Sequence, residues 1–324
     1  MSESVISVLE EKNGSFVPEK MLIGFSEAGI ERELNRSGFE WEHNGEKGYR
    51  IVKSLPVYCE GLLKKYLDSP GKYKVYLMQS VDSTNNFMKT EFKAGAPEFS
   101  VALAEQQTAG RGRMNRKFIS PLGGIYMSVL FTPERSKKII KPAELVNITA
   151  AAAVSVAKTI EAMTGLKAGI KWVNDIFLNG KKVCGILTEG SISPDQGGYD
   201  YIIVGIGVDL ISGFDGTGLE TIAGGIFEKN HLPKDICRVK NKLTAGILNN
   251  LVFYYEHFGE ETEKILKEEY ISRLFIMGQK VTVVRTDLTY EAEVIGLEDD
   301  FSLSILNENG NRETLHSGEV RLKI

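Results

Sequence analysis

Residues 72–273 constrain the fold most strongly, because their predicted strands outnumber their predicted helices and do not alternate regularly with them. Runs typical of strands occur at 74–78, 101–105, 125–131, 170–172, 175–178, 183–188 and 201–210. Runs typical of helices occur at 84–92, 142–164, 234–258 and 262–273. Doubly wound α/β domains need strands and helices in regular alternation. The sequence therefore predicts an α+β domain with a largely antiparallel or mixed sheet.

Local turn signals support two of these boundaries. Asn179-Gly180 separates two adjacent predicted strands and is a strong hairpin signal, because both residue types accept a positive φ. Gly165 is expected to end the long apolar helix. The longest apolar stretch, 143–157, is interrupted by polar residues and is too short to cross a bilayer. It predicts a buried helix and no membrane partner.

Residues 1–53 are predicted to form a winged helix-turn-helix. An amphipathic helix is expected to start at Val5 and to fade at Asn13-Gly14. A second helix is expected near 27–36, with Ser26 as its N-cap and Gly38 as its stop. Two short strands then flank Asn44-Gly45, which is another hairpin signal.

The rest of the chain divides into a linker, 54–71, with a helix expected at 55–67, the central domain, 72–273, and a C-terminal domain, 274–324. Short alternating runs separated by turn residues fill the C-terminal domain, at 279–285, 290–296, 302–306, 312–315 and 319–323. Such a series predicts a small β-barrel.

Composition excludes several classes of protein. The chain has 43 Asp+Glu against 39 Lys+Arg, a net charge of −4 that argues against nonspecific adhesion to nucleic acid or membranes. Its three cysteines, Cys59, Cys184 and Cys237, are far apart and odd in number, so neither a disulfide framework nor a Cys-x-x-Cys metal site is indicated. The acidic N-terminus lacks the charge of a secretory signal. These features predict a cytoplasmic protein.

A cationic loop, defined as residues 110–121, stands out in this acidic chain. It combines Gly110 and Gly112 with the cations Arg111, Arg113, Arg116 and Lys117. Glycines let a backbone approach a ligand closely, and arginine forks fit carboxylate and phosphate groups. The loop therefore predicts a site for an anion. By itself it is equally consistent with a solvated basic turn or a segment that touches nucleic acid.

Three further pieces accompany the loop: Asp82-Ser-Thr-Asn85, Lys171-Trp-Val-Asn-Asp175 and Gly180-Lys-Lys-Val-Cys-Gly185. The first offers hydroxyl and amide groups, although Ser83 or Thr84 could simply cap a helix. The other two place Lys171 and Lys182 on strands expected to be neighbours, where a bound anion would justify burying them. A P-loop, a dinucleotide-binding glycine fingerprint and a His-Glu-x-x-His metal motif are absent from the sequence.

Together and in this order, the pieces resemble the biotin–protein ligases, and with residues 1–53 they resemble the bifunctional ligase/repressor class. Residues 110–121 follow the family's Gly-Arg-Gly-Arg loop, 171–186 follow its Lys-Trp-Pro-Asn-Asp and Lys-x-x-Gly-Ile motifs, 205–207 follow its Gly-Ile-Gly strand, and 315–320 its C-terminal domain. The resemblance covers nearly the whole chain. It implies a catalytic domain of the biotin/lipoate ligase type and an SH3-like C-terminal domain.

The resemblance also implies a reaction. Biotin and ATP would form biotinyl-5′-AMP and pyrophosphate, with Mg²⁺ held only through substrate phosphates, and the biotin would pass to a lysine of a biotin carboxyl carrier domain. Residues expected around biotin and the adenylate are Ser83, Thr84, Asn85, Gln107, Gly110, Arg111, Gly112, Arg113, Lys182, Gly185, Gly205 and Gly207. Expected catalytic residues are Lys182, Arg113, Lys171 and Asp175, and Asn174 and Asp209 are expected near phosphate and Mg²⁺.

Four positions depart from the family pattern: Asn115 replaces a glycine, Phe118 a tryptophan, Val173 a proline and Asp209 an asparagine. Asn tolerates positive φ, so the first change is mild. A carboxylate facing phosphates would repel them unless a metal bridges, so Asp209 is expected to increase the Mg²⁺ dependence of the enzyme.

Residues 1–53 carry seven Lys+Arg against ten Glu, although DNA affinity depends mainly on basic residues that neutralise phosphates. Operator binding therefore stays open, as does dimerisation, which only the family implies. Two alternatives also stay open: a biotin-sensing transcription regulator with weak ligase activity, and a lipoate–protein ligase.

Overall fold

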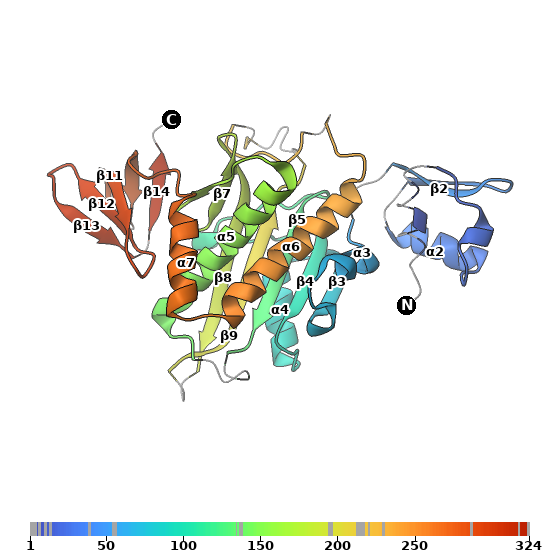
Figure 1. The fold of residues 1–324 in the computed structure, drawn as a ribbon, viewed down its shortest axis with the longest axis horizontal. Coiled ribbons are helices and arrows are strands. Elements are labelled where there is room, and N and C mark those ends of the chain that lie inside the picture. Colours follow the sequence, from blue (N-terminus) through green and yellow to red (C-terminus); the bar gives the residue numbers. More distant parts are fainter. Residues whose placement is uncertain are drawn as a thin grey trace.

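The computed structural model describes residues 5, 8–9, 12, 15–37, 40–53, 57–133, 135, 139–193, 197–211, 218–219, 221–228, 231–285, 288–316 and 318–322. Three units follow one another along an elongated molecule, as Figure 1 shows. A small helical unit with a two-stranded hairpin lies at one end, a seven-stranded sheet covered by helices forms the middle, and a five-stranded sheet lies at the other end.

The central sheet is mixed, as the sequence predicts. Its strand order is β3(Lys74–Val81), β4(Ser100–Gln107), β5(Ile125–Phe131), β9(Tyr199–Val208), β8(Lys181–Ile192), β7(Asp175–Leu178) and β6(Gly169–Lys171). Only β3 and β4 run parallel among these pairs. One expectation is wrong: the strands of Lys171 and Lys182 are not neighbours, because β7 lies between them.

The two glycine signals are confirmed. Asn179 and Gly180 have φ values of 50° and 78° and join β7 to β8 in a two-residue hairpin. Gly165 ends the long helix in the left-handed region, with φ of 71°. Both turns use backbone conformations that most side chains disfavour, which is why their sequence signals are reliable.

Helices cover both faces of the sheet. Alternate residues of β4, β5 and β9 divide between two cores: Val101, Val129 and Val204 join the large core, whereas Ala102, Leu130 and Ile203 join a small core around Met88. Met88 belongs to α4(Thr84–Lys93), which therefore covers the second face. The first face carries α5(Leu145–Thr164) and α6(Ile236–Glu256), with α7(Glu260–Ile271) at their side.

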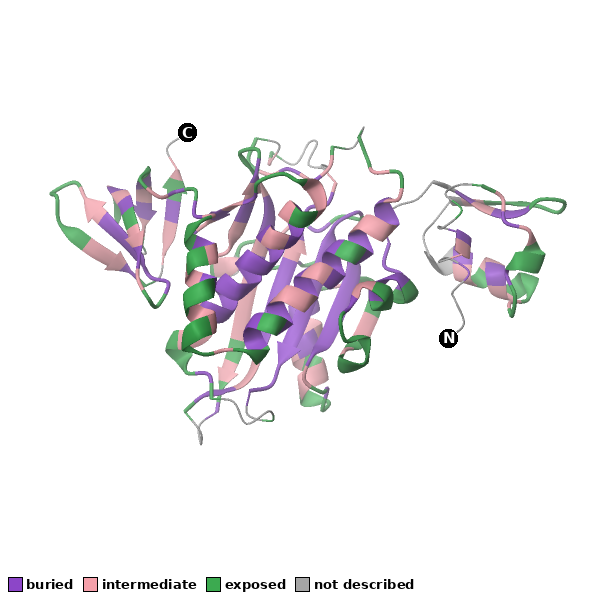
Figure 2. Cartoon of the chain, viewed as in Figure 1, coloured by how far each residue is buried: buried purple, intermediate pink, exposed green. Residues whose placement is uncertain are grey.

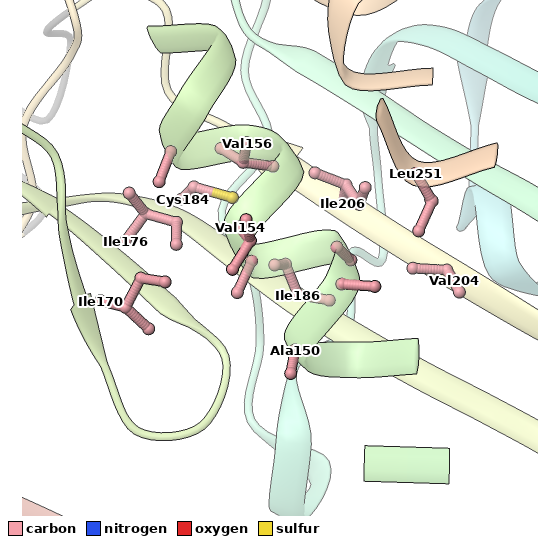
Figure 3. Close-up of a cluster of buried hydrophobic side chains, with 14 of the residues drawn as sticks. Ala150, Val154, Val156, Ile170, Ile176, Cys184, Ile186, Val204, Ile206 and Leu251 are labelled. Atoms are coloured by element: carbon pink, nitrogen blue, oxygen red, sulfur yellow. The ribbon is translucent and has the colours of Figure 1, made fainter. Parts of the chain in front are cut away.

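Helix α5 is largely buried, as Figure 2 shows. Ala150 and Val154 lie close to Ile186 and Ile206 of the sheet (Figure 3). The segment Pro142–Thr164 is long and apolar enough to cross a membrane by length and composition, but 72% of its most apolar window is buried inside the protein. Its apolarity is thus explained by packing between the sheet and α6.

The N-terminal unit has its own core, in which Ile30 and Leu34 of α2(Glu27–Ser37) pack against Tyr49. The Oγ of Ser26 accepts a hydrogen bond from the N–H of Gly29 at 3.2 Å, so the expected N-cap is confirmed. The predicted hairpin is formed by β1(Glu40–Asn44) and β2(Gly48–Lys53). A short 3-10 helix, η1(Glu19–Met21), precedes α2.

Parts of the N-terminal predictions lie outside the described residues. These are Gly38, most of the first helix, of which residues 5, 8 and 9 are described as helical, and residues 54–56 of the linker. The linker helix α3(Glu60–Tyr66) is shorter than predicted. Val57 of the linker and Cys237 of α6 both pack in the N-terminal core, so this unit is attached to the first turn of α6.

The C-terminal unit is an open antiparallel sheet in the order β13(Arg312–Leu315), β12(Leu303–Asn307), β11(Thr289–Leu297), β10(Lys280–Val284) and β14(Glu319–Leu322). The predicted strands are confirmed, but the predicted closure into a barrel is not: within the described residues, the edge strands β13 and β14 do not pair with each other. Instead, Glu319 of β14 contacts Arg116 of the cationic loop. The edge of β14 therefore faces the central domain.

A buried ion pair joins three separate segments. The Nζ of Lys240, on α6, lies 2.6 Å from Oε2 of Glu105, on β4, and the two side chains are 0% and 8% exposed. The other oxygen of Glu105 accepts the backbone N–H of Tyr58 at 2.7 Å. Asn241 bonds to the carbonyl of Val57 at 2.9 Å and to the N–H of Cys59 at 2.9 Å. The linker is thereby fixed to both β4 and α6.

We expect Glu105→Gln to destabilise the protein by about 3 kcal/mol or more, because it leaves the Lys240 ammonium buried without its counter-charge. Urea unfolding followed by circular dichroism measures this. The control is Asp299→Asn, which removes the partner of Lys267 in an exposed pair and should cost less than about 1 kcal/mol. An unfolding free energy for Glu105→Gln as close to wild type as that of the control would contradict the expectation.

Candidate active site

A cavity of about 750 Å³ lies where the central sheet meets the cationic loop and β14. Its floor includes Gly185 of β8 and Gly205 and Gly207 of β9. A Cβ on Gly207 would lie 2.4 Å from the Phe118 ring, and one on Gly205 would lie 2.1 Å from Oδ1 of Asn85. Glycine is therefore required for these two side chains to lie directly on the strands.

The cationic loop folds back on itself over this floor. The N–H of Gly112 donates to the carbonyl of Arg116 at 2.8 Å, and the N–H of Phe118 donates to the carbonyl of Gly110 at 2.9 Å. Gly110 does not line the cavity, but a Cβ there would lie 2.3 Å from the Phe118 carbonyl, so it makes the close approach possible. The positive φ in the turn falls on Met114, at 55°, and not on Asn115.

Arginines tie the loop to two other segments. The guanidinium of Arg113 donates to Oδ1 of Asn174 at 3.0 Å and to the carbonyl of Gly318 at 3.4 Å. Arg116 pairs with Glu319 of β14. Asn174 is held in turn by the Ile186 carbonyl, to which its Nδ2 donates at 2.7 Å. The loop, the β6–β7 turn and β14 thus enclose the cavity together.

Positive charge dominates the cavity wall. The lining cations are Arg111, Arg113, Arg116, Lys117, Lys171, Lys182 and Arg321. The described carboxylates of the lining are both paired: Asp175 lies 2.7 Å from Lys182, and Glu319 pairs with Arg116. Burial lowers the pKa of Lys171, and Asp175 opposes this shift. An anionic ligand fits this surplus of cations.

The end of the cavity at the start of α4, called the neutral end, is lined mainly by hydroxyl and amide groups. Arg111 is the lining cation beside it, with Nη1 at 3.4 Å from Oδ1 of Asn86. The backbone N–H of Thr84 donates to Oε1 of Gln107 at 2.9 Å, and Nε2 of Gln107 donates to Oγ of Ser120 at 2.9 Å. Ser83 occupies the N-cap position of α4 but makes no side-chain capping bond, so capping does not account for it. These groups can bind a neutral polar ligand group by hydrogen bonds.

The structure brings most of the predicted site residues together. Those that line the cavity are Ser83, Thr84, Asn85, Gln107, Arg111, Gly112, Arg113, Lys171, Asn174, Asp175, Lys182, Gly185, Gly205 and Gly207. Residues that the sequence did not single out include Phe275, Gly318, Glu319 and Ile222. They come from segments remote in sequence, and only the Ser-Gly-Glu-Val stretch around 317–320 carried a recognisable signal.

Two predicted site residues, Gly110 and Asp209, do not line the cavity. Asp209 is only 7% exposed. Its backbone bonds to Val183 and Ile226 at 2.8 and 2.9 Å, which holds it beneath the floor. Burial raises the pKa of Asp209 well above its usual value, although Lys182 opposes this. The predicted contact with phosphate or Mg²⁺ is therefore not supported.

No cluster of metal-binding side chains occurs at the cavity within the part of the chain that the structure describes. Among the described residues, the group of His, Cys, Asp and Glu side chains close enough to share an ion is Glu19, Glu27 and His43, in the N-terminal unit. All three are exposed, and such groups are common on protein surfaces without an ion. A metal ion at the cavity would have to arrive with its ligand.

Comparison with known proteins identifies relatives of the segment that carries the cavity. Residues 77–209 match the biotin/lipoate A/B protein ligase family. The chain is 29% identical over 302 residues to the bifunctional ligase/repressor BirA of Bacillus spizizenii, a match that spans 90% of this chain and 87% of that protein. It is 33% identical over 144 residues to biotin–[acetyl-CoA-carboxylase] ligase of Paracoccus denitrificans, covering 44% of this chain and 58% of that protein.

A solved structure shares the fold. The biotin protein ligase from Aquifex aeolicus in complex with biotin and ATP superposes with a TM-score of 0.59 and 25% sequence identity. The match covers 77% of this chain and 98% of that one. The similarity therefore extends well beyond the segment that the family comparison matches.

We expect Asp209→Asn to stabilise the protein at neutral pH. Folding raises the pKa of Asp209, so the folded state favours the protonated acid. The resulting contribution to stability is fully present below the unfolded-state pKa of about 3.9 and is lost as the pH rises through the folded-state pKa. Asn imitates the protonated acid, so Tm should rise by about 2 °C or more at pH 7.5 and the gain should shrink toward pH 4.

Thermal melts of wild type and variant across this pH range measure the effect. Asp68→Asn, at an exposed position, is the matched control and should leave Tm unchanged throughout. A lower Tm for Asp209→Asn than for wild type at pH 7.5 would overturn the interpretation.

Proposed function

We propose, from the premise that residues 77–209 form a domain of the biotin/lipoate A/B protein ligase family, that this chain is an ATP-dependent biotin–protein ligase. The enzyme would join biotin to a lysine of a biotin carboxyl carrier domain of a biotin-dependent carboxylase. A relative named biotin–[acetyl-CoA-carboxylase] ligase matches 44% of this chain, and one named bifunctional ligase/repressor matches 90% of it.

One observation carries the proposal: a single cavity has a neutral polar end at Thr84 and Gln107 and a cationic end at Arg113 and Lys182. Biotin has the matching polarity, with a neutral ureido ring at one end and a carboxylate at the other. ATP adds further negative charge beside that carboxylate. The cations offset the repulsion between the two anions and stabilise the charge that develops on phosphorus.

The first step forms the mixed anhydride. A carboxylate oxygen of biotin attacks the α-phosphorus of ATP, the bond to the bridging oxygen breaks, and pyrophosphate leaves. We assign Lys182 to the carboxylate and the α-phosphate, Arg113 to the same phosphate, and Lys171, with Asn174 nearby, to the departing phosphates. Lys182 would exchange its 2.7 Å contact with Asp175 for the incoming anion.

The second step transfers biotin. The amine of the acceptor lysine attacks the anhydride carbonyl, AMP leaves, and the amine loses a proton. We assign Asp175, a carboxylate of the cavity wall, to orient that amine and take its proton once Lys182 has turned to the phosphate. The folded cationic loop covers the glycine floor, and keeping water from the anhydride would prevent its hydrolysis.

Mg²⁺ fits this site only as a companion of ATP. Both described carboxylates of the lining, Asp175 and Glu319, are engaged by cations, so the wall offers no set of oxygen ligands of the kind Mg²⁺ prefers. Substrate phosphates would supply those ligands. The ion would neutralise phosphate charge.

The flanking units complete the proposal. We assign the N-terminal unit to the winged helix-turn-helix type and the C-terminal sheet to the SH3-like type, and we place the protein in the cytoplasm, where its three buried cysteines would stay reduced. A homodimer formed through the central sheet is the assembly that the bifunctional class would use.

We expect biotin, but not lipoate, to support exchange between ATP and labelled pyrophosphate. Lys182→Ala and Arg113→Ala should each lower this exchange by about 100-fold or more, because each removes a charge aimed at the transition state. Lys181→Ala is the matched control, since Lys181 is exposed and does not line the cavity. Normal exchange by Lys182→Ala would remove the role assigned to it, and exchange with lipoate alone would favour a lipoate ligase.

Operator binding is a second candidate function, which the hairpin, the helix and the separate core of the N-terminal unit favour. The charges of this unit count against tight binding. Arg50 of the hairpin is paired with Glu42 at 2.6 Å, and Glu19 and Glu27 gather around His43. These carboxylates would oppose the approach of DNA phosphates.

We expect no retarded complex at 0.2 M salt in a gel shift with the DNA upstream of the protein's own gene, with or without biotin and ATP, because phosphate neutralisation supplies most DNA affinity. A charge-reversed variant, Glu27→Lys, should increase binding at low salt. A specific complex formed by the wild type at 0.2 M salt would establish the regulatory function instead.

A further inference from the structure

Glu189, on β8, accepts a hydrogen bond with each of its two carboxylate oxygens, both from side chains of α4 near the neutral end of the cavity. Its Oε2 accepts from Nδ2 of Asn85 at 2.8 Å, and its Oε1 accepts from Nζ of Lys89 at 2.8 Å. Burial raises the pKa of Glu189, but the hydrogen bonds from Lys89 and Asn85 outweigh burial and hold it below its usual value. The carboxylate is therefore ionised at neutral pH and can only accept.

Both amide protons of Asn85 are used within the protein. Besides its bond to Glu189, Nδ2 donates to the Leu187 carbonyl at 3.3 Å, and Oδ1 accepts from Oγ of Ser128 at 2.6 Å. The side chain lies directly on Gly205. Asn85 therefore has no amide proton left to donate to a ligand, and it transmits the orientation that Glu189 imposes to Ser128.

The orientation of the Asn85 amide determines which acceptors the hydroxyl protons of Ser128 and Thr84 point to. Ser128 has one hydroxyl proton, and Asn85 presents an oxygen to it, so this proton goes to Asn85. Oγ of Ser128 and Oγ1 of Thr84 lie 2.7 Å apart, and with the Ser128 proton on Asn85 this contact takes the Thr84 proton. Oε1 of Gln107, at 3.1 Å from Oγ1 of Thr84, is the other acceptor within reach, but it already accepts the backbone N–H of Thr84. Either acceptor uses the single hydroxyl proton of Thr84. Thr84, which lines the cavity, is left with lone pairs only.

We propose that Glu189 is a positioning residue that sets the hydrogen-bond polarity of the neutral end, so that Thr84 acts as an acceptor for a ring N–H of the ligand. The inference rests on the proposed function, in which that N–H belongs to the ureido ring of biotin. Lys89 and Ser128 are the other members of this relay. Glu189 touches neither substrate nor reacting atoms, so it should affect the binding of biotin and not the chemical step.

The test uses the fact that a glutamine has one accepting oxygen where Glu189 has two. In Glu189→Gln, the Lys89 ammonium binds the single amide oxygen of the glutamine. The glutamine N–H₂ group then faces the N–H₂ group of Asn85, and two donors oppose each other. We expect KM for biotin to rise about tenfold in ATP–pyrophosphate exchange, the effect of one unsatisfied polar contact, with kcat within about twofold of wild type. Lys89→Met alone should change KM by less than about threefold, because the carboxylate stays in place.

The double variant Lys89→Met/Glu189→Gln should return KM to within about threefold of wild type, since the glutamine amide can then present its oxygen to Asn85. Lys93 is exposed on the same helix as Lys89, so Lys93→Met controls for the loss of a lysine and should leave KM for biotin unchanged. Wild-type KM in Glu189→Gln, or a double variant no better than Glu189→Gln, would overturn the inference. Absence of biotin-dependent exchange in the wild type would instead refute the proposed function.

A ligand-side measurement keeps the inference testable if Glu189→Gln does not fold. Two cyclic carbamate analogues of biotin, each with one ring N–H replaced by oxygen, are compared as inhibitors of exchange by the wild type. The analogue that places an oxygen against the lone pairs of Thr84 should bind at least about tenfold more weakly than the other. Equal binding of the two analogues would contradict the assigned polarity.

Discussion

The ammonium group of Lys240 has no access to solvent, and the carboxylate of Glu105 balances its charge at 2.6 Å. That carboxylate belongs to β4, which ends two residues later at Gln107, a wall residue of the cavity. Glu105 also holds the backbone of Tyr58, in the segment that leads from the N-terminal unit. One ion pair therefore fixes β4, α6 and the linker in a common position. A buried pair of this kind contributes little net stability but strongly penalises any arrangement that separates it.

Features that local backbone geometry dictates could be predicted from the sequence. The Asn179-Gly180 hairpin and the Gly165 helix end both need positive φ, and few residue types accept it. The strands and helices of the central domain follow from apolar periodicity, and the ordered motifs placed Arg113, Lys171 and Lys182 around one cavity. These predictions depend on short stretches of chain, where the sequence and the local structure correspond closely.

Features that depend on contacts between distant segments could not be predicted. The hairpin signal at Asn179-Gly180 predicts that β7 pairs with the strand of Lys182, but the position of β6 beyond β7, at the edge of the sheet, is decided by the packing of the whole sheet. Asp209 reads as a ligand-facing residue, yet the register of β9 and its backbone contacts place it under the floor. The contact between Glu319 of β14 and Arg116 likewise joins two units that are far apart in sequence. Glu189 likewise gains its importance only from the partners that α4 brings to it.

The burial of Cys237 has a chemical consequence. Although it belongs to α6, this thiol packs in the core of the N-terminal unit, whereas Cys184 packs in the core of the central sheet. Release of the N-terminal unit would uncover the first thiol and leave the second covered by α5. Two of the three buried thiols of the chain therefore lie in different cores. The alkylation rate of Cys237 would report detachment of the N-terminal unit, and that of Cys184 would report opening of the central core, without any introduced label.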